Sequence, residues 1–186
     1  MNKKKMIILI LVIALLIIIG VLIFMKLKGK DIISIETEIT PLEEITDEQE
    51  RQTMISLYFT NPETNTLMPE ARRIDAKDLL DNPYKTLVEL LIQKPKNEKL
   101  VTSIPEGTKV NNAILKNNIV ELDLSKEFIE NQESNVDKIN LSIYCIVNTL
   151  TELNEVDGIK ILIDGEEGKS FENVDFSLKE VFFRND

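Results

Sequence analysis

SNVDKINLSIYCIVNTLTEL, residues 134–153, is the stretch that decides the fold class of this chain. Its apolar residues recur at steps of three and four, which predicts an amphipathic helix with one face on a sheet. They are Val136, Ile139, Ile143, Ile146, Val147, Leu150 and Leu153. Cys145 lies inside this pattern, so we interpret it as a buried thiol that packs as a small apolar side chain, rather than as a nucleophile.

Strand-forming segments stand on both sides of this helix. Residues 110–115 and 119–124 flank Lys116-Asn117-Asn118, which predicts a hairpin. Residues 159–163, IKILI, form a further strand that stops at Asp164-Gly165.

An earlier pair of strands is predicted nearer the N-terminus. Residues 54–59 and 67–74 are rich in strand formers and are joined by the polar turn 61–65. Pro69 lacks a backbone N–H, so it indicates an edge strand or a bulge. These two segments predict a second hairpin.

A shorter helix follows the first hairpin. Asn82 is the expected N-cap and Pro83 the first helical residue. The connection after it, residues 94–108, is long, and we expect Leu100 and Ile104 to hold it against the core.

The resulting order, β-β-α-β-β-α-β, predicts an α+β fold of two helices packed on a mostly antiparallel sheet. Residues 53–186 are sufficient for a single core. The tail, residues 171–183, is expected to add a last strand or a clasp.

An unbroken apolar run precedes the domain at residues 6–25, with three lysines on each side. Twenty helical residues span about 30 Å, the thickness of a bilayer core. We expect a cytoplasmic tail at 1–5, a single-pass transmembrane signal-anchor at 6–25, a charged linker at 26–52 and an extracytoplasmic domain at 53–186. A cleaved secretory signal is the alternative, but the run is long for one and no small-residue cleavage site follows. A lipoprotein signal is excluded, because the only cysteine is Cys145.

Composition excludes several classes of function. The first 30 residues hold six of the 22 basic residues and no acidic one, so 32 acidic and 16 basic residues follow, a net charge of −16. Such a surface repels nucleic acid. The absence of histidine removes Ser-His-Asp and Cys-His catalysis, and no Ser-x-x-Lys motif or glycine-rich phosphate loop occurs. We therefore expect no enzyme activity and no cofactor.

Three charged residues in the second predicted strand are candidates for partner binding. Glu70 and Arg72 are two positions apart and so face the same way, while Arg73 faces the opposite way. One interpretation is an ion pair between Glu70 and Arg72 that holds the hairpin. The other is a partner-binding edge made by all three.

The segment IPEGT is a second candidate for partner binding through Ile104, Pro105 and Glu106. It is either a recognition loop or a rigid turn that leads into the next strand.

The acidic turn at residues 164–168, DGEEG, suggests two further hypotheses. Carboxylates in a glycine turn coordinate calcium in some proteins, but the spaced ligands of an EF-hand are missing. Glu166 and Glu167 with Asp123 also suggest acid catalysis by carboxylates. We interpret the segment as an ordinary turn and expect no metal.

The domain resembles the GerM domain, named for a spore germination and sporulation protein. Motifs in the family's order carry the resemblance, which covers nearly all of residues 53–170. They are Leu57-Tyr58-Phe59; Leu67-Met68-Pro69-Glu70 with Arg72 and Ile74; the helix from Leu87 to Pro95; Thr102 with Ile104-Pro105-Glu106-Gly107-Thr108; Val120-Glu121-Leu122-Asp123-Leu124-Ser125 with Phe128; the long helix; and Ile161-Leu162-Ile163-Asp164-Gly165. The chain departs from the family at Lys94-Pro95, where Gly-Pro is common.

The resemblance implies a membrane-attached, extracytoplasmic protein of sporulation, germination or envelope assembly, with no established enzyme activity. We expect protein partners in the spore or cell envelope, and one hypothesis is side-by-side packing of further copies of this domain into a ring-like complex. The anchor, the hairpin edge near Pro69 and the lack of catalytic motifs motivate it. A peptidoglycan or wall-polymer binding module is the alternative, although tryptophan is absent and tyrosine scarce. A carboxylate-based wall hydrolase is the third class.

Overall fold

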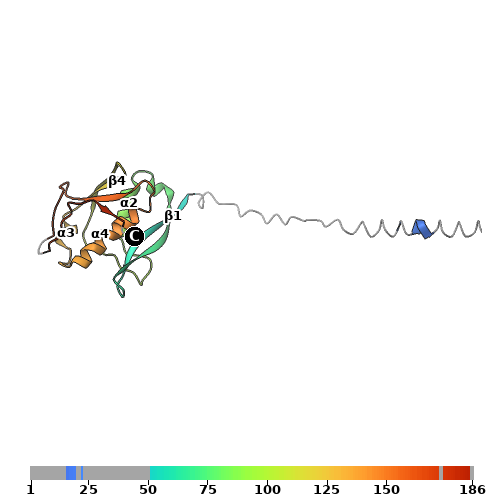
Figure 1. Cartoon of the computed structure of the whole chain (residues 1–186), viewed down its shortest axis with the longest axis horizontal. Helices are drawn as coiled ribbons and strands as arrows, with labels where there is room; N and C mark the ends of the chain where they lie inside the picture. The colour runs from blue at the N-terminus through green and yellow to red at the C-terminus, as the bar shows by residue number, and fades with distance from the viewer. Residues whose placement is uncertain (1–15, 20–21, 23–50, 172–173, 185–186) are drawn as a thin grey trace, which may run out of the picture. The chain divides into compact units, whose positions relative to one another are not determined.

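A computed structural model describes residues 16–19, 22, 51–171 and 174–184 (Figure 1). Most of the predicted membrane run 6–25 lies outside these residues, as do the tail 1–5 and nearly all of the linker 26–52. Residues 16–19 and 22 are helical. Among the residues that the structure describes, no helix is both long enough and apolar enough to cross a bilayer.

The predicted N-terminal hairpin is present as a two-stranded antiparallel sheet, β1 (Gln52–Asn61) and β2 (Thr66–Asp75). The turn between the strands places Asn65 at a positive φ of 53°, a backbone conformation that asparagine tolerates. Tyr58 pairs with Pro69 in the register.

A separate four-stranded sheet has the order β3-β4-β5-β6. Its strands are β3 (Val110–Lys116), β4 (Ile119–Leu124), β5 (Gly158–Ile163) and β6 (Phe182–Phe183). The β3–β4 and β5–β6 pairs are antiparallel, but β4 and β5 are parallel. The α+β class is therefore confirmed, and three of the four strand pairings are antiparallel, as expected. The expectation of a single sheet is wrong, because the strands form two sheets. A helical crossover between β4 and β5 returns the chain to the end where β4 began, which permits parallel pairing.

That crossover contains α3 (Glu127–Glu130) and α4 (Val136–Leu150). The predicted long helix is confirmed, with tighter bounds than 134–153. It begins after Asn135, because the side chain of Asn135 accepts hydrogen bonds from the backbone N–H groups of Asp137 and Lys138.

The shorter predicted helix is α2 (Pro83–Ile92), which follows the 3-10 turn η1 (Ala76–Leu79). Asn82 is its N-cap, as expected, and accepts from the N–H of Lys85 at 3.0 Å. The side-chain amide of Asn82 also donates to the carbonyl of Ala113 in β3, at 2.9 Å. This cap therefore fixes α2 against the larger sheet.

Helices α2 and α4 each pack against both sheets. α4 contacts β1, β2 and β5, and α2 contacts β1, β3 and α4. Figure 1 shows α2 and α4 in the middle of the domain beside β1 and β4. The expectation that α4 has a single buried face is too narrow, because Ser142 and Thr149 are buried as well as its apolar stripe.

The long connection and the tail are anchored as predicted. Leu100 and Ile104 are buried, and Val101 exchanges two backbone hydrogen bonds with Thr60 of β1. In the tail, Phe171 and Leu178 are buried before the chain pairs with β5 as β6. Among the described residues, every buried core residue lies between Leu57 and Leu178, within the compact unit Thr46–Asp186. This unit therefore contains a complete core.

Candidate functional site

Glu70 and Arg72 form a buried ion pair on the inner face of β2. Arg72 Nη2 lies 2.5 Å from Glu70 Oε1. The side chain of Arg72 is only 5% exposed and that of Glu70 only 8%. The guanidinium also lies over the ring of Phe59, 5.6 Å from its centroid. The predicted ion pair is therefore present, and neither side chain is exposed to a partner.

Glu70 also fixes the connection after α2. Its Oε2 accepts a hydrogen bond from the backbone N–H of Asn97 at 2.8 Å. Burial alone would raise the pKa of Glu70, but the N–H of Asn97 and the guanidinium of Arg72 hold it below its ordinary value. The buried, charged carboxylate of Glu70 thus links β2 to the connection at residues 94–108.

The outer edge of β2 is open. Tyr58 and Thr60 direct their N–H groups away from β2, to Thr149 Oγ1 and to the carbonyl of Val101. Their register partners Pro69 and Leu67 must therefore also point away from β1. Among the described residues, no backbone group bonds to this outer edge of β2.

The side chains beside this edge are exposed. Pro69, Ala71 and Arg73 are exposed on the outer face, and Met68 is 45% exposed on the other. Since proline has no N–H to donate, Pro69 is tolerated only because its nitrogen faces outward. Arg73 is thus the one predicted charged residue of β2 that a partner could reach.

The IPEGT segment is a rigid turn. Ile104 and Pro105 are buried. Thr108 Oγ1 donates to the carbonyl of Pro105 at 2.7 Å, and Asn131 Nδ2 donates to the carbonyl of Glu106 at 2.7 Å. Only the side chain of Glu106 is exposed among the three predicted recognition residues, and it borders a hollow described below.

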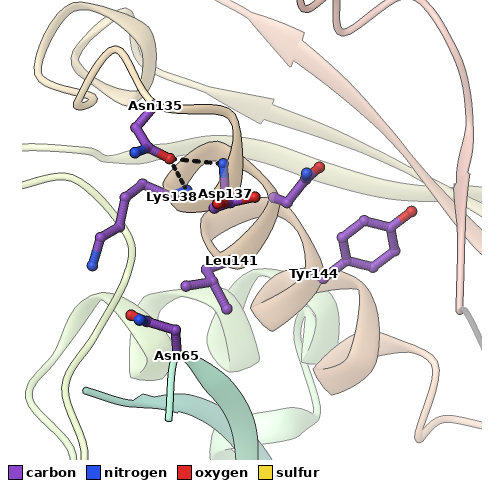
Figure 2. Close-up of a pocket in the computed structure, with 7 residues that line it drawn as sticks. Asn65, Asn135, Asp137, Lys138, Leu141 and Tyr144 are labelled. Carbon is purple, nitrogen blue, oxygen red and sulfur yellow. Dashed lines mark hydrogen bonds between the residues drawn. The ribbon is translucent and has the colours of Figure 1, made fainter. Parts of the chain in front are cut away.

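A surface hollow of about 450 Å³ lies between the tip of the hairpin and the first half of α4 (Figure 2). Figure 2 shows Asn65 of the hairpin turn below Leu141 of α4, with Lys138 beside them. Asn140 and Tyr144 also line it. Asn65, Asn135 and Asn140 supply carboxamides to its lining, so it offers hydrogen-bond donors and acceptors together.

A second hollow, of about 330 Å³, lies on the other side of Lys138. Lys138 lines both hollows, so they are neighbours. The second is bordered by residues 101–106 and 131–133. Gln132 Oε1 is buried there and has no hydrogen-bond partner among the described residues.

The acidic turn is an ordinary turn, as interpreted from the sequence. Glu166 pairs with Lys169 at 2.6 Å and Glu167 with Lys160 at 2.7 Å. Asp123 Oδ1 accepts from the N–H of Gly165 at 2.8 Å. Within the part of the chain that the structure describes, no group of three histidine, cysteine or acidic side chains is placed to hold a metal ion.

A model of the family described as "Germane: Sporulation and spore germination" matches residues 56–169. The chain belongs to this family. The resemblance to GerM domains predicted from the sequence is thus confirmed.

Two solved structures from Bacillus subtilis share the fold of this Germane domain. The first GerMN domain of the sporulation protein GerM has a TM-score of 0.58 and 21% identity, over 72% of this chain and 99% of that one. The tandem GerMN domains of the same protein have a TM-score of 0.56 and 19% identity, over 73% of this chain. This chain spans 46% of the tandem structure, about half its length. A comparison with curated proteins finds no match.

The hollows of this Germane domain were missed by sequence reasoning. The only sequence signal for them is a concentration of carboxamides around the start of the long helix, at Asn131, Gln132, Asn135 and Asn140. Such residues are also common in turns and helix caps, and Asn135 is in fact a cap. The partners of this cluster come from the hairpin tip and from residues 101–106, which only the fold brings near.

Proposed function

We propose that this Germane protein is a membrane-anchored, non-enzymatic interaction module in sporulation, spore germination or cell-envelope assembly. It acts by protein–protein contact, and one form of that contact is side-by-side packing of its own domains into a ring-like complex. The family match supports the sporulation or germination context.

The apolar run at residues 6–25 supports the anchor, because it matches a bilayer in length and contains no ionisable residue. In this proposal the N-terminus stays inside and residues 53–186 lie outside the membrane. The charged linker at 26–52 then separates the domain from the bilayer.

The open outer edge of β2 is the observation that carries the contact mechanism. An unpaired strand edge is a template for pairing with another chain. Pro69 interrupts the row of donors in the middle of the edge, so a partner pairs over a short stretch and packs on the exposed side chains of Ala71 and Arg73.

The oligomeric state of the compact unit Thr46–Asp186 tests self-association. Light scattering after size exclusion is expected to show a mass that rises with protein concentration. Ala71→Lys is expected to return the protein to a monomer, because an edge lysine opposes strand pairing. Asn154→Lys adds the same charge at an exposed position after α4 and should leave association unchanged. A strict monomer at high concentration would contradict self-association.

Crosslinking of the full-length protein in sporulating cells tests the partner class. We expect enrichment of this protein and of other membrane-anchored sporulation proteins, with crosslinks at β2. Enrichment of wall fragments alone would contradict a protein–protein role and favour the wall-polymer alternative.

A further inference from the structure

We propose that the two hollows that share Lys138 form one groove that binds a neutral glycan strand rich in acetamido and hydroxyl groups. This binding surface is separate from the β2 edge of the proposed function. It is made by the start of α4, the hairpin tip and the two connections at residues 101–106 and 131–133.

The lining of the groove matches the hydrogen bonds that a sugar makes. Side-chain carboxamides come from Asn65 and Asn140 in the first hollow and from Asn131 in the second. A carboxamide donates and accepts at once, as do a hydroxyl pair and an acetamido group. Tyr144 adds an aromatic side chain at the far end of the first hollow. The groove thus offers polar contacts along its length and one ring.

Gln132 supplies an independent sign of a missing partner. Its buried Oε1 accepts no hydrogen bond from any described residue. Buried polar groups in folded proteins are almost always paired, so an unpaired one calls for an explanation. Gln132 lines the second hollow, and the terminal torsion of glutamine is soft, so its carboxamide can adjust to a bound ligand. A sugar hydroxyl or acetamido N–H bound there would satisfy it.

The charges around the groove disfavour an anionic polymer. Glu106, Glu133 and Asp137 line it, against the single ammonium of Lys138. Lys138 makes no ion pair with any described residue, so its three N–H donors remain available to hydroxyl oxygens. Acidic side chains on both sides would repel a polyanion, and the net charge of the domain adds to that repulsion.

The probe for this proposal is a hexamer of N-acetylglucosamine, titrated into ¹⁵N-labelled Thr46–Asp186. This unit holds the complete core, so it is a valid substitute for the full chain. Amide shifts are expected in residues 101–106 and 131–144. A glucose hexamer, which lacks the acetamido group, is expected to bind more weakly.

Substitutions in the groove test whether it binds the hexamer. Lys138→Met and Asn140→Ala are each expected to weaken hexamer binding by about three- to tenfold, the loss of one or two hydrogen bonds. Asn154→Ala, outside the groove, serves as the matched control. Ala71→Lys, which tests the β2 edge, should leave glycan binding unchanged. The proposed self-association and the proposed glycan binding can therefore be tested independently.

Three results of the hexamer experiments would overturn the proposal. They are no amide shifts at millimolar hexamer, shifts that fall outside the groove, and equal affinity in the groove variants and the control. Shifts in the groove with an extended peptide but not with the hexamer would also overturn it and assign the groove to protein ligands.

Discussion

The backbone N–H of Tyr58 donates to Thr149 Oγ1 at 3.0 Å, across a sequence separation of 91 residues. This bond joins the free side of β1 to the last turn of α4. Together with the two hydrogen bonds between Thr60 and Val101, it closes one edge of the hairpin. The other edge, on β2, is left as the place where a further strand could add.

Thr149→Val is expected to destabilise the domain by about 1–3 kcal/mol, because valine keeps the shape of threonine but leaves the Tyr58 N–H without its acceptor. Urea unfolding of Thr46–Asp186 measures this change. Thr151→Val is the control on the same helix end, since its hydroxyl only donates to the Val147 carbonyl, which already accepts from the helix. Equal losses in the two variants would contradict a special role for the Tyr58 bond.

Glu70→Gln is expected to lower stability at neutral pH by about 3 kcal/mol, because it leaves the buried guanidinium of Arg72 without a counter-charge. Adding Arg72→Met should recover part of this loss, since the unpaired charge is then removed as well. Urea unfolding at pH 7 of the single and double variants tests both statements. No recovery in the double variant would contradict the ion-pair explanation.

The same pair makes stability depend on pH in a defined direction. The pKa of Glu70 is lowered from 4.5 by folding, so its contribution is present above that value and is lost as the pH falls through the lowered value. The difference in unfolding free energy between the wild type and Glu70→Gln should therefore narrow as the pH drops below about 4.5. A gap that is constant from pH 7 to pH 3 would contradict the lowered pKa.

Gly158→Ala is expected to destabilise the domain by about 1–3 kcal/mol through overpacking. An added Cβ would lie 2.9 Å from Phe183 Cδ1 and 3.0 Å from the carbonyl oxygen of Phe182. Hydrogen exchange should show that β6 opens more readily in the variant. Combining it with Phe183→Ala relieves the ring contact, so the double variant should lose less than the sum of the single losses.

Local features of this fold were predictable from the sequence because their causes are local. Asn82 and Asn135 cap helices through bonds to residues two or three positions away, although only Asn82 was identified as a cap in advance. Asn117 and Asn118 both adopt positive φ, as a tight hairpin turn requires. The alternation of Glu70 and Arg72 likewise placed the two side chains on one face.

Other features depend on contacts between distant segments, and no local pattern encodes them. The parallel pairing of β4 with β5 follows from the path of the crossover, not from either strand's residues. The burial of Glu70 depends on Asn97, 27 positions later. The half-buried Tyr58 accepts a hydrogen bond from Arg184 of the tail, 126 positions later. The groove around Lys138 is likewise assembled from three separate parts of the chain.

Cys145 is expected to be unreactive in the folded protein. Its side chain is buried in the core, and burial raises the pKa of the thiol to about 12, so almost no thiolate forms at pH 8. A thiol-specific chromogenic reagent at pH 8 should label native Thr46–Asp186 only at the rate at which the domain opens. In urea above the unfolding midpoint, labelling should be complete and fast. Thr149→Val should speed native labelling by the factor that its loss of stability sets, if labelling requires global opening. Rapid labelling of the native wild type would place Cys145 near a surface and contradict its role as a core residue.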